Sequence, residues 1–391
     1  MHHKRFIGCV AVAGVLLASG RVMPAQDGEL HPLPERPSAV KDAIDRSRAL
    51  ITARQTEHRF PGISAAVAVR GRIIWSEGFG WADLEQHVPV SSLTRFRLGS
   101  VSKAFCAVAV AALVEQGRLD LDAPIQRYVP DFPVKRWPIT ARQLAGHQAG
   151  IRHYQDKDGA FIDLRVDSRV YDHPLAGAPH FSSVRAGLAF FENDPLEFEP
   201  GTQSQYSSYG FNVLSAVVEG ASKKPYLDAV SHLVTEPLGL LATVADHPFR
   251  VIPNRSRFYS SSKEFGTLNV PSLDSSYKWA GGGFLSTPED LARFLSALLH
   301  PGFLSTKTLD LMFTPQRLKS GDPTNVGIGW RIDKDGQGRR RFHHGGTIEG
   351  GGAILVALPD EDVTIAILTN QLPRFSEADA SQIASWFAAA R

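Results

Sequence analysis

Alternating and continuously apolar stretches predict strands near both ends of the chain. Residues 62–84 predict two strands that turn at Arg70-Gly71, with alternating side chains in the second strand. The C-terminal third contains four more strand-like stretches, with the turn-forming sequences DKDGQG and PDED among them: VGIGWRI, RRRFHH, GAILVALP and VTIAILTN. We expect strands from both ends to form one antiparallel sheet.

Helical patterns flank these strands and fill the middle of the chain. One helix is expected to begin at Ser38, whose hydroxyl can cap it, and another, EADASQIASWFAAAR, closes the sequence. The middle contains helical pieces such as YGFNVLSAVVEGASK, joined by polar loops with many Gly and Pro residues. The predicted fold is α/β (α+β), an antiparallel sheet flanked by helices plus a mainly helical lobe. The sheet lobe would comprise about 38–119 and 271–391, and the helical lobe about 120–270.

The first residues have the pattern of a targeting segment. MHHKRF is basic, IGCVAVAGVLLASG is apolar but short for a membrane span, and small residues follow. We therefore expect a signal peptide over residues 1–26, cleaved between Gly20 and Gln26, a linker over 27–37 and the domain over 38–391. The protein would then be exported, either periplasmic or secreted. The alternative is an uncleaved membrane anchor.

Composition narrows the class of protein further. The 42 basic and 40 acidic residues nearly balance, so the overall charge does not argue for nucleic acid as a partner. Only Cys106 would remain after cleavage, which excludes an internal disulfide. The dense basic run from Arg339 to Arg341 predicts an exposed strand whose charge discourages sheet pairing. The alternative is a surface site that binds anionic substrates.

Four serines are followed three positions later by lysine, and one of them has a context suited to catalysis. Residues three apart share a helix face, and a serine at a helix N-terminus lies beside unpaired N–H groups. Ser100 and Lys103 precede AFCAVAVAALVEQG, which is apolar on nearly every side and predicts a buried helix. Ser260 and Ser275 lie in stretches too short for a helix, and capping explains Ser38. The alternative is that Ser100 only caps its helix while Lys103 reaches solvent.

Two further stretches carry groups that could act with this pair. Tyr206, in EPGTQSQYSSYG, could serve as a base if a cation such as Lys103 stabilised its phenolate. Alternatively, Tyr206 is a packing residue, and Tyr209 is a nearby decoy. RFHHGGTIEGGG places His343 and His344 at a strand end, before glycines that allow a ligand to approach the backbone. Adjacent strand residues point to opposite sides, so at least one histidine should be structural.

Taken in order, SVSK, YSS and HHGG resemble the three motifs of the serine β-lactamase and penicillin-binding-protein superfamily. The likeness is greatest to its class C, esterase and D-alanyl-D-alanine-peptidase branch, and GHQAGIRHY is similar to serine β-lactamase-like proteins. Supporting stretches extend the resemblance over about residues 45–372: ITARQLAGHQAGI, FEPGTQSQYSS, WAGGGFLSTPEDLARF and VGIGW. The resemblance implies a β-lactamase/transpeptidase-like fold, which agrees with the pattern-based prediction.

The resemblance also implies a role for each motif residue. Ser100 would be the acylated nucleophile, with Lys103 and Tyr206 as its proton-handling partners. The implied substrate-binding residues are Ser208, His343, Gly345 and Gly346. The N–H groups of Ser100 and Gly346 would form the oxyanion hole, and His147 would be structural.

Two departures from the family pattern bear on the substrate. Ser208 stands where many relatives have asparagine, and serine offers a substrate amide only one short donor. His343 replaces lysine, so a permanent positive charge for a β-lactam carboxylate is missing near neutral pH. Neither change removes the acyl-transfer residues. Esterase or peptidase activity is therefore favoured over β-lactamase activity.

The expected function is an exported serine hydrolase that cleaves ester, peptide or β-lactam acyl bonds of small molecules through an acyl-enzyme on Ser100. No cofactor is implied, and the sequence lacks the H-E-x-x-H metal motif. It also lacks the G-x-S-x-G elbow of α/β-hydrolases. The alternative is a catalytically silent protein of the same fold that binds a cell-wall peptide or lipid.

Overall fold

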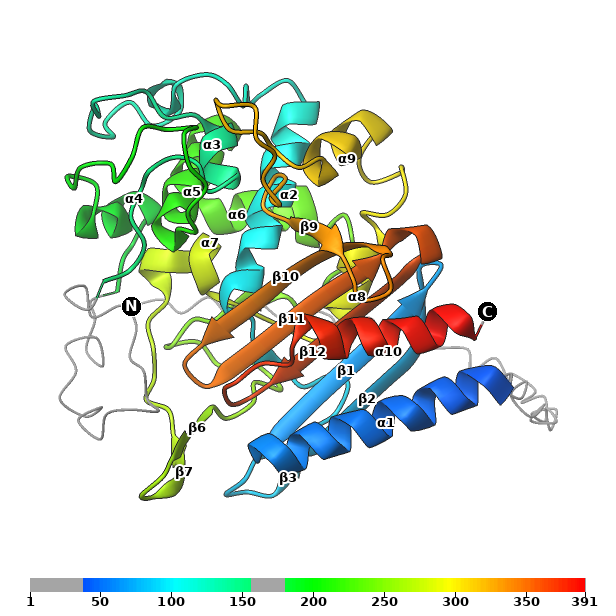
Figure 1. Ribbon diagram of the computed structural model, residues 1–391. Helices are drawn as coiled ribbons and strands as arrows, with labels where there is room; N and C mark the ends of the chain where they lie inside the picture. Colours follow the sequence, from blue (N-terminus) through cyan, green and yellow to red (C-terminus); the bar gives the residue numbers. More distant parts are fainter. Residues whose placement is uncertain (1–37, 156–179, 391) are drawn as a thin grey trace, which may run out of the picture. The chain divides into compact units, whose positions relative to one another are not determined.

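The computed structural model describes residues 38–155 and 180–390, and a seven-stranded antiparallel sheet lies at the centre of this part (Figure 1). The strand order is β3-β2-β1-β12-β11-β10-β9, so β1 pairs with β12, and Ile63 lies opposite Thr369. Both ends of the described chain therefore build one sheet, as the sequence pattern predicts. The strands are β1 Gly62–Val69, β2 Arg72–Asp83, β3 Val88–Pro89, β9 Arg331–Lys334, β10 Arg340–Ile348, β11 Gly351–Leu358 and β12 Val363–Thr369.

Helices α1 (Ser38–His58) and α10 (Glu377–Ala389) cover one face of this sheet (Figure 1). Every second residue of the central strands faces them, and Val67, Val356 and Ile365 join their buried apolar cluster. Burying a side chain of this size contributes about 1.5–3 kcal/mol. These two predicted helices are confirmed.

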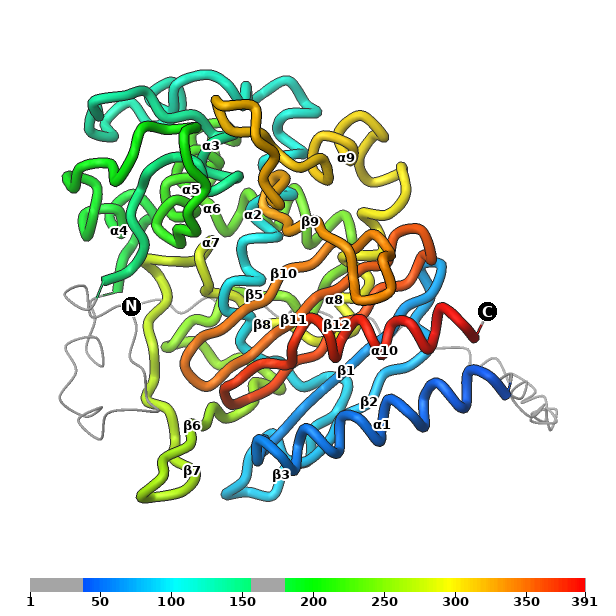
Figure 2. Tube along the Cα trace, in the orientation of Figure 1, coloured from blue at the N-terminus to red at the C-terminus, as the bar shows by residue number. Residues whose placement is uncertain are grey.

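The other face of the sheet supports α8 and the helical side of the molecule. Helix α8 (Pro288–Ser296) places Ala292 against Ala66 and Ala68 of β1. Helix α2 (Ser102–Glu115) runs from the sheet up between the remaining helices (Figure 2) and is buried from Ser102 to Leu113. The prediction of a buried helix after the Ser100 motif is confirmed.

The helices around α2 come from both inside and outside residues 120–270. Helix α9 packs with α2 although it follows residue 270. Strands also occur within 120–270: β5 pairs with β8, while β6 and β7 form a hairpin. The helical side of the molecule therefore extends beyond the predicted range of 120–270, and that range also contains strands. The helices are α3 Ala141–Ala145, α4 Val184–Gly187, α5 Ser208–Ser222, α6 Tyr226–Val230, α7 Trp279–Gly282 and α9 Thr306–Phe313. The minor strands are β4 Phe96–Arg97, β5 Val244–Ala245, β6 Tyr259–Ser262, β7 Gly266–Asn269 and β8 Phe284–Ser286.

Two details differ from or add to the sequence-based picture. The strand predicted from VGIGWRI begins only at Arg331, because Gly327 and Gly329 lie in irregular backbone and Gly329 has a positive φ of 75°. Over residues 38–155 and 180–390, no helix has both the length and the apolar character needed to cross a bilayer.

Candidate active site

Ser100 lies in a short 3₁₀ turn, η1 (Gly99–Val101), that leads directly into α2. Gly99 has a φ of 49°, and a methyl group built on it would lie 2.7 Å from both the amide nitrogen and the carbonyl oxygen of Thr347. Position 99 therefore requires glycine, since any side chain would collide with the backbone of β10. This contact sets the Ser100 turn against β10 and leaves Ser100 partly exposed.

Lys103 is fully buried one turn along and makes three hydrogen bonds. Its Nζ donates to Ser100 Oγ at 3.0 Å, to Ser208 Oγ at 3.0 Å and to the Gly281 carbonyl at 2.6 Å. Burial lowers the pKa of Lys103, because the charged form loses hydration. Lys103 therefore gives up its proton more readily than a surface lysine and can act as a base toward Ser100. The alternative that Lys103 reaches solvent is wrong.

Tyr206 reaches Ser100 from the segment just before α5. Its hydroxyl donates to Ser100 Oγ at 2.7 Å, and Lys103 Nζ lies 5.0 Å from its ring centroid. Burial acts to raise the pKa of Tyr206, but the positive charge of Lys103 and hydrogen bonds to the hydroxyl outweigh it, so the pKa is lowered. Tyr209 instead packs in the core, where its ring stacks on Phe191 with centroids 4.0 Å apart. Tyr206 is thus the tyrosine brought to the serine–lysine pair.

Ser208 lies behind the serine–lysine pair and is almost fully buried. It is the first residue of α5, and its hydroxyl accepts a hydrogen bond from Lys103. The structure therefore gives no support to the predicted substrate-binding role. Its observed contact instead fixes the position of the Lys103 ammonium.

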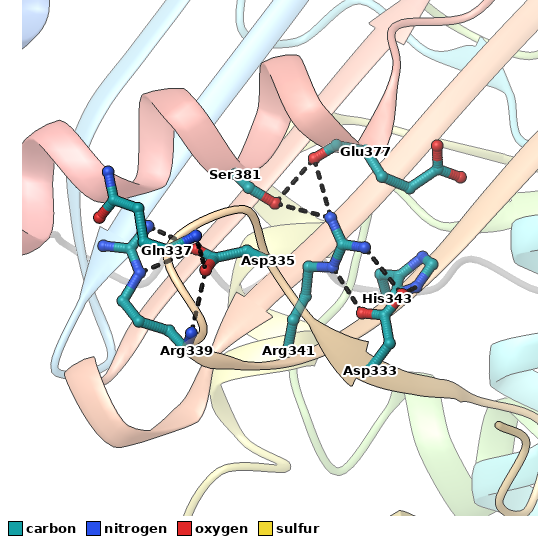
Figure 3. Close-up of polar contacts among 8 residues, drawn as sticks. All are labelled: Asp333, Asp335, Gln337, Arg339, Arg341, His343, Glu377 and Ser381. Atoms are coloured by element: carbon teal, nitrogen blue, oxygen red, sulfur yellow. Dashed lines mark hydrogen bonds and ion pairs between the residues drawn. The ribbon is translucent and has the colours of Figure 1, made fainter.

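The two adjacent histidines lie on opposite faces of β10. His343 pairs with Val356, which packs toward α1 and α10, whereas His344 pairs with Leu355, which belongs to the core around α2. Figure 3 shows His343 beside Asp333, with 3.1 Å between Nε2 and the carboxylate. The structure thus turns His343 away from Ser100, and the predicted substrate-binding role of His343 is corrected: His344 has the required orientation.

His344 is buried and uncharged at neutral pH. Burial, followed by the nearby positive charge of Lys103, lowers the pKa of His344 to about 3. Its Nδ1 lies 2.9 Å from the carbonyl oxygen of Gly345. At this position of the third motif, the chain therefore offers a neutral ring able to hydrogen-bond but no permanent cation.

Gly345 and Gly346 also face opposite ways. A methyl group built on Gly346 would lie 1.9 Å from the Leu98 carbonyl oxygen, whereas one built on Gly345 would meet the Arg374 guanidinium at 2.6 Å. Gly346 is therefore the glycine that permits the close approach of the Ser100 turn, whereas Gly345, a predicted substrate-binding residue, faces Arg374 on the other side of β10.

The oxyanion-hole donor on β10 is also shifted by one residue from the prediction. In an antiparallel strand the N–H and C=O of one residue point to the same side. The amide nitrogen and carbonyl oxygen of Thr347 both face Gly99, so the Thr347 N–H lies on the Ser100 side of β10. The Gly346 N–H points the other way, toward β11. The N–H groups of Ser100 and Thr347 are thus the pair that this geometry offers to an oxyanion.

The basic run at positions 339–341 is only partly exposed. Arg339 pairs with Asp335 at 2.6 Å and Arg341 pairs with Asp333 at 2.7 Å (Figure 3). Arg341 also donates to Ser381 Oγ on α10 at 3.1 Å. The prediction of an exposed strand is therefore wrong for Arg339, which pairs within the turn between β9 and β10, and for Arg341, which links β9, β10 and α10.

Sequence reasoning missed two backbone groups of the site. The Gly281 carbonyl accepts from Lys103, and the Thr347 amide faces the Ser100 turn. The glycine runs WAGGG and HHGGT were the available signals, since glycine marks close backbone approach. Among the residues that the structure describes, no group of three or more His, Cys, Asp or Glu side chains could hold a metal ion.

Comparison with known proteins places this constellation in a family. A family model described as Beta-lactamase matches residues 47–386. The chain is 32% identical to the serine beta-lactamase-like protein LACTB, mitochondrial, of Mus musculus, across 88% of this chain and 77% of that protein. It is 28% identical to esterase EstB of Burkholderia gladioli, across 76% of this chain and 81% of that protein.

A solved structure gives the same result. The D-stereospecific amidohydrolase from a Streptomyces species superposes with a TM-score of 0.69 at 26% identity, across 90% of this chain and 98% of that chain. The fold, the three motifs in order and the family match across nearly all of residues 38–390 agree. The chain therefore belongs to the β-lactamase family and is a serine hydrolase of that family.

Proposed function

We propose that this hydrolase forms an acyl-enzyme on Ser100 and hydrolyses small ester or peptide substrates. One observation carries the proposal: Ser100 Oγ lies within hydrogen-bonding distance of both Lys103 Nζ, at 3.0 Å, and the Tyr206 hydroxyl, at 2.7 Å. A serine hydroxyl is a weak nucleophile until a neighbouring base takes its proton. Lys103 and Tyr206 both have lowered pKa values, and each is a candidate for the base that takes this proton.

The reaction would proceed in two steps. Ser100 Oγ forms a bond to the acyl carbon while its proton passes to the Lys103–Tyr206 pair, and the Ser100 and Thr347 N–H groups stabilise the oxyanion. The bond to the alcohol or amine then breaks, and the leaving group takes up that proton. In the second step water attacks the acyl carbon and loses a proton to the same pair. The bond between the acyl carbon and Ser100 Oγ then breaks, Ser100 Oγ takes up that proton, and the acid leaves.

Support for the substrate preference comes from His344. This side chain lies on the face of β10 that packs toward α2, and its pKa of about 3 keeps it neutral over the physiological range. The strand position thus supplies no permanent charge for the carboxylate of a β-lactam. Relatives named as an esterase and an amidohydrolase support the ester and amide classes.

Turnover measurements test this function. We would follow hydrolysis of p-nitrophenyl acetate, a peptide ending in D-alanyl-D-alanine, and nitrocefin by the wild type, Ser100→Ala and Ser38→Ala. Ser38 is a matched control, because it is another serine followed three residues later by lysine but lies exposed at the start of α1. We expect Ser100→Ala alone to lose activity, with the ester or peptide turned over faster than nitrocefin. Activity retained by Ser100→Ala would contradict the proposal, and acylation without release would favour a binding protein.

We also propose export of the protein. The support is the basic and then apolar sequence of residues 1–26, which lie outside the described residues. The LACTB relatives of mouse and human are named as mitochondrial, so a leader segment could also direct an organellar route. Fractionation of cells that express the full chain, together with N-terminal sequencing of the mature protein, distinguishes export from retention.

A further inference from the structure

Two histidines of the segment between α3 and residue 155 flank the ring of Tyr206. The ring centroids of His147 and Tyr206 are 4.5 Å apart, and those of His153 and Tyr206 are 5.3 Å apart. The first contact is tilted and the second is edge-to-face. Tyr206 is thus held between two imidazoles, while its hydroxyl points to Ser100.

The same two rings also hold the backbone that follows Tyr206. His147 Nδ1 accepts a hydrogen bond from the Ser207 N–H at 3.3 Å, and His153 Nδ1 accepts one from the Ser208 N–H at 3.2 Å. These N–H groups belong to the N-terminal turn of α5, where a helix has no internal acceptors for its first amides. Each histidine therefore satisfies a backbone donor next to the tyrosine.

This hydrogen-bond pattern fixes the protonation state of both rings. A backbone N–H can only donate, so each Nδ1 must carry a lone pair and each ring proton must lie on Nε2. Burial lowers the pKa of His147 well below its usual value and lowers the pKa of His153 to about 4. Repulsion from Lys103 acts in the same direction on both rings. Both histidines are therefore neutral acceptors over the physiological range.

The backbone around these histidines connects the two segments at further points. His147 has a positive φ of 58°, an unusual conformation for a residue with a side chain. Its carbonyl accepts from the Gln205 N–H at 2.8 Å, and the Ser207 hydroxyl donates to the Arg152 carbonyl at 2.8 Å. The loop that follows α3 therefore forms hydrogen bonds with the residues immediately before and after Tyr206.

We propose that His147 and His153 are positioning residues that aim the Tyr206 hydroxyl at Ser100. This inference rests on the proposed acyl-enzyme function. It attributes the position of the Tyr206 hydroxyl to two residues outside the three motifs. Neither histidine has a hydrogen bond to Ser100 within the described part of the chain, so their effect must pass through Tyr206 and the start of α5. His153 is the better test residue, since it is partly exposed, whereas His147 is buried.

A double-mutant cycle separates positioning from general structural support. His153→Leu removes the acceptor, whereas His153→Asn places an amide oxygen close to the Nδ1 position. Each change is made in the wild type and in Tyr206→Phe, and kcat and KM for a p-nitrophenyl ester are measured per active site titrated with a fluorophosphonate. The Tyr206→Phe background lacks the hydroxyl that the histidine is proposed to aim.

We expect His153→Leu to lower kcat/KM by about 10- to 100-fold in the wild-type background, mainly through kcat, because the Ser208 N–H loses its acceptor and the Tyr206 hydroxyl is no longer held toward Ser100. In Tyr206→Phe the same change should cost less than about threefold, and His153→Asn should stay near wild type. If His153→Leu fails to fold, His153→Gln, which moves the acceptor outward, replaces it with the same expectation.

Two results would overturn the inference. Equal losses in both backgrounds, or a His153→Asn variant as impaired as His153→Leu, would show that His153 does not act through Tyr206. If the wild type reacts with the fluorophosphonate no faster than Ser100→Ala does, the result contradicts both the proposed function and this inference. The two failures are thus distinguishable.

Discussion

Replacing Lys103 with methionine should abolish most activity while leaving the protein folded. Methionine has a similar length but no charge, so the change removes the proposed base and keeps most of the packing around it. Loss of general-base assistance lowers rates by about 10² to 10⁴. We expect a fall in kcat/KM of that size for a p-nitrophenyl ester.

The effect of Lys103→Met on stability follows from the three contacts of the ammonium group. The change orphans the Gly281 carbonyl, which accepts from Nζ at 2.6 Å, and an unsatisfied buried acceptor costs about 1–3 kcal/mol. It also removes a fully buried charge, whose desolvation costs several kcal/mol and opposes folding. These opposed contributions limit the expected destabilisation to about 3 kcal/mol.

The pH dependence of this stability difference has a definite sign. The pKa of Lys103 in the folded protein lies below the 10.5 of an unperturbed lysine, so the unfolded chain binds more protons between these two values. Wild-type stability should therefore rise with pH through that window, and the methionine variant lacks this contribution. Urea unfolding at intervals from pH 7 up to the unperturbed 10.5 should show the wild type gaining stability relative to Lys103→Met.

Two results would refute this reasoning about Lys103. A Lys103→Met variant that keeps more than a tenth of the wild-type kcat/KM would show that Lys103 does not handle the proton. A stability difference that stays constant from pH 7 up to 10.5 would show that the Lys103 pKa is not lowered by folding. A Tyr206→Phe comparison at the same pH values identifies the remaining base.

Two further pairs of variants test the geometry around Ser100. Tyr206→Phe should lower kcat/KM by about 10²-fold or more, because it removes the hydroxyl 2.7 Å from Ser100 Oγ, whereas the matched Tyr209→Phe should stay within about tenfold of wild type. Equal losses in steady-state ester hydrolysis would contradict this assignment. Gly346→Ala should destroy most activity, since its methyl would lie 1.9 Å from a backbone oxygen. Gly345→Ala should keep more activity, because its methyl meets only an arginine side chain, which can move. Comparable ester hydrolysis by both alanine variants would argue against the proposed close approach.

Features with strong local periodicity could be predicted from the sequence. The apolar run after Lys103 specifies a buried helix, and the i, i+3 spacing then brings Ser100 and Lys103 together. Strands β1, β2, β10, β11 and β12 were likewise predictable, because their alternating or largely apolar patterns can be recognised without knowledge of tertiary contacts. The short strand β3 and the start of β9 were not predicted.

The orientation of the third motif could not be predicted, because a shift of one residue along a strand exchanges its two faces. His343 and His344 are both buried, so polarity alone does not show which one faces α2. The register of β10 against β11 shows that His344 is the histidine that faces α2. The same strand orientation makes Thr347, and not Gly346, the residue whose N–H faces the Ser100 turn. The partners of Arg341 were equally hidden, since Asp333 and Ser381 come from β9 and α10.

The central claim, that Ser100 is an activated nucleophile, is tested most directly by intact-protein mass after exposure to a fluorophosphonate. Wild type, Ser100→Ala and the matched control Ser38→Ala would be treated side by side. The structure predicts a single adduct on the wild type and on Ser38→Ala, and none on Ser100→Ala, because Ser100 Oγ is the hydroxyl in contact with both Lys103 and Tyr206. An adduct on Ser100→Ala, or none on the wild type, would contradict it.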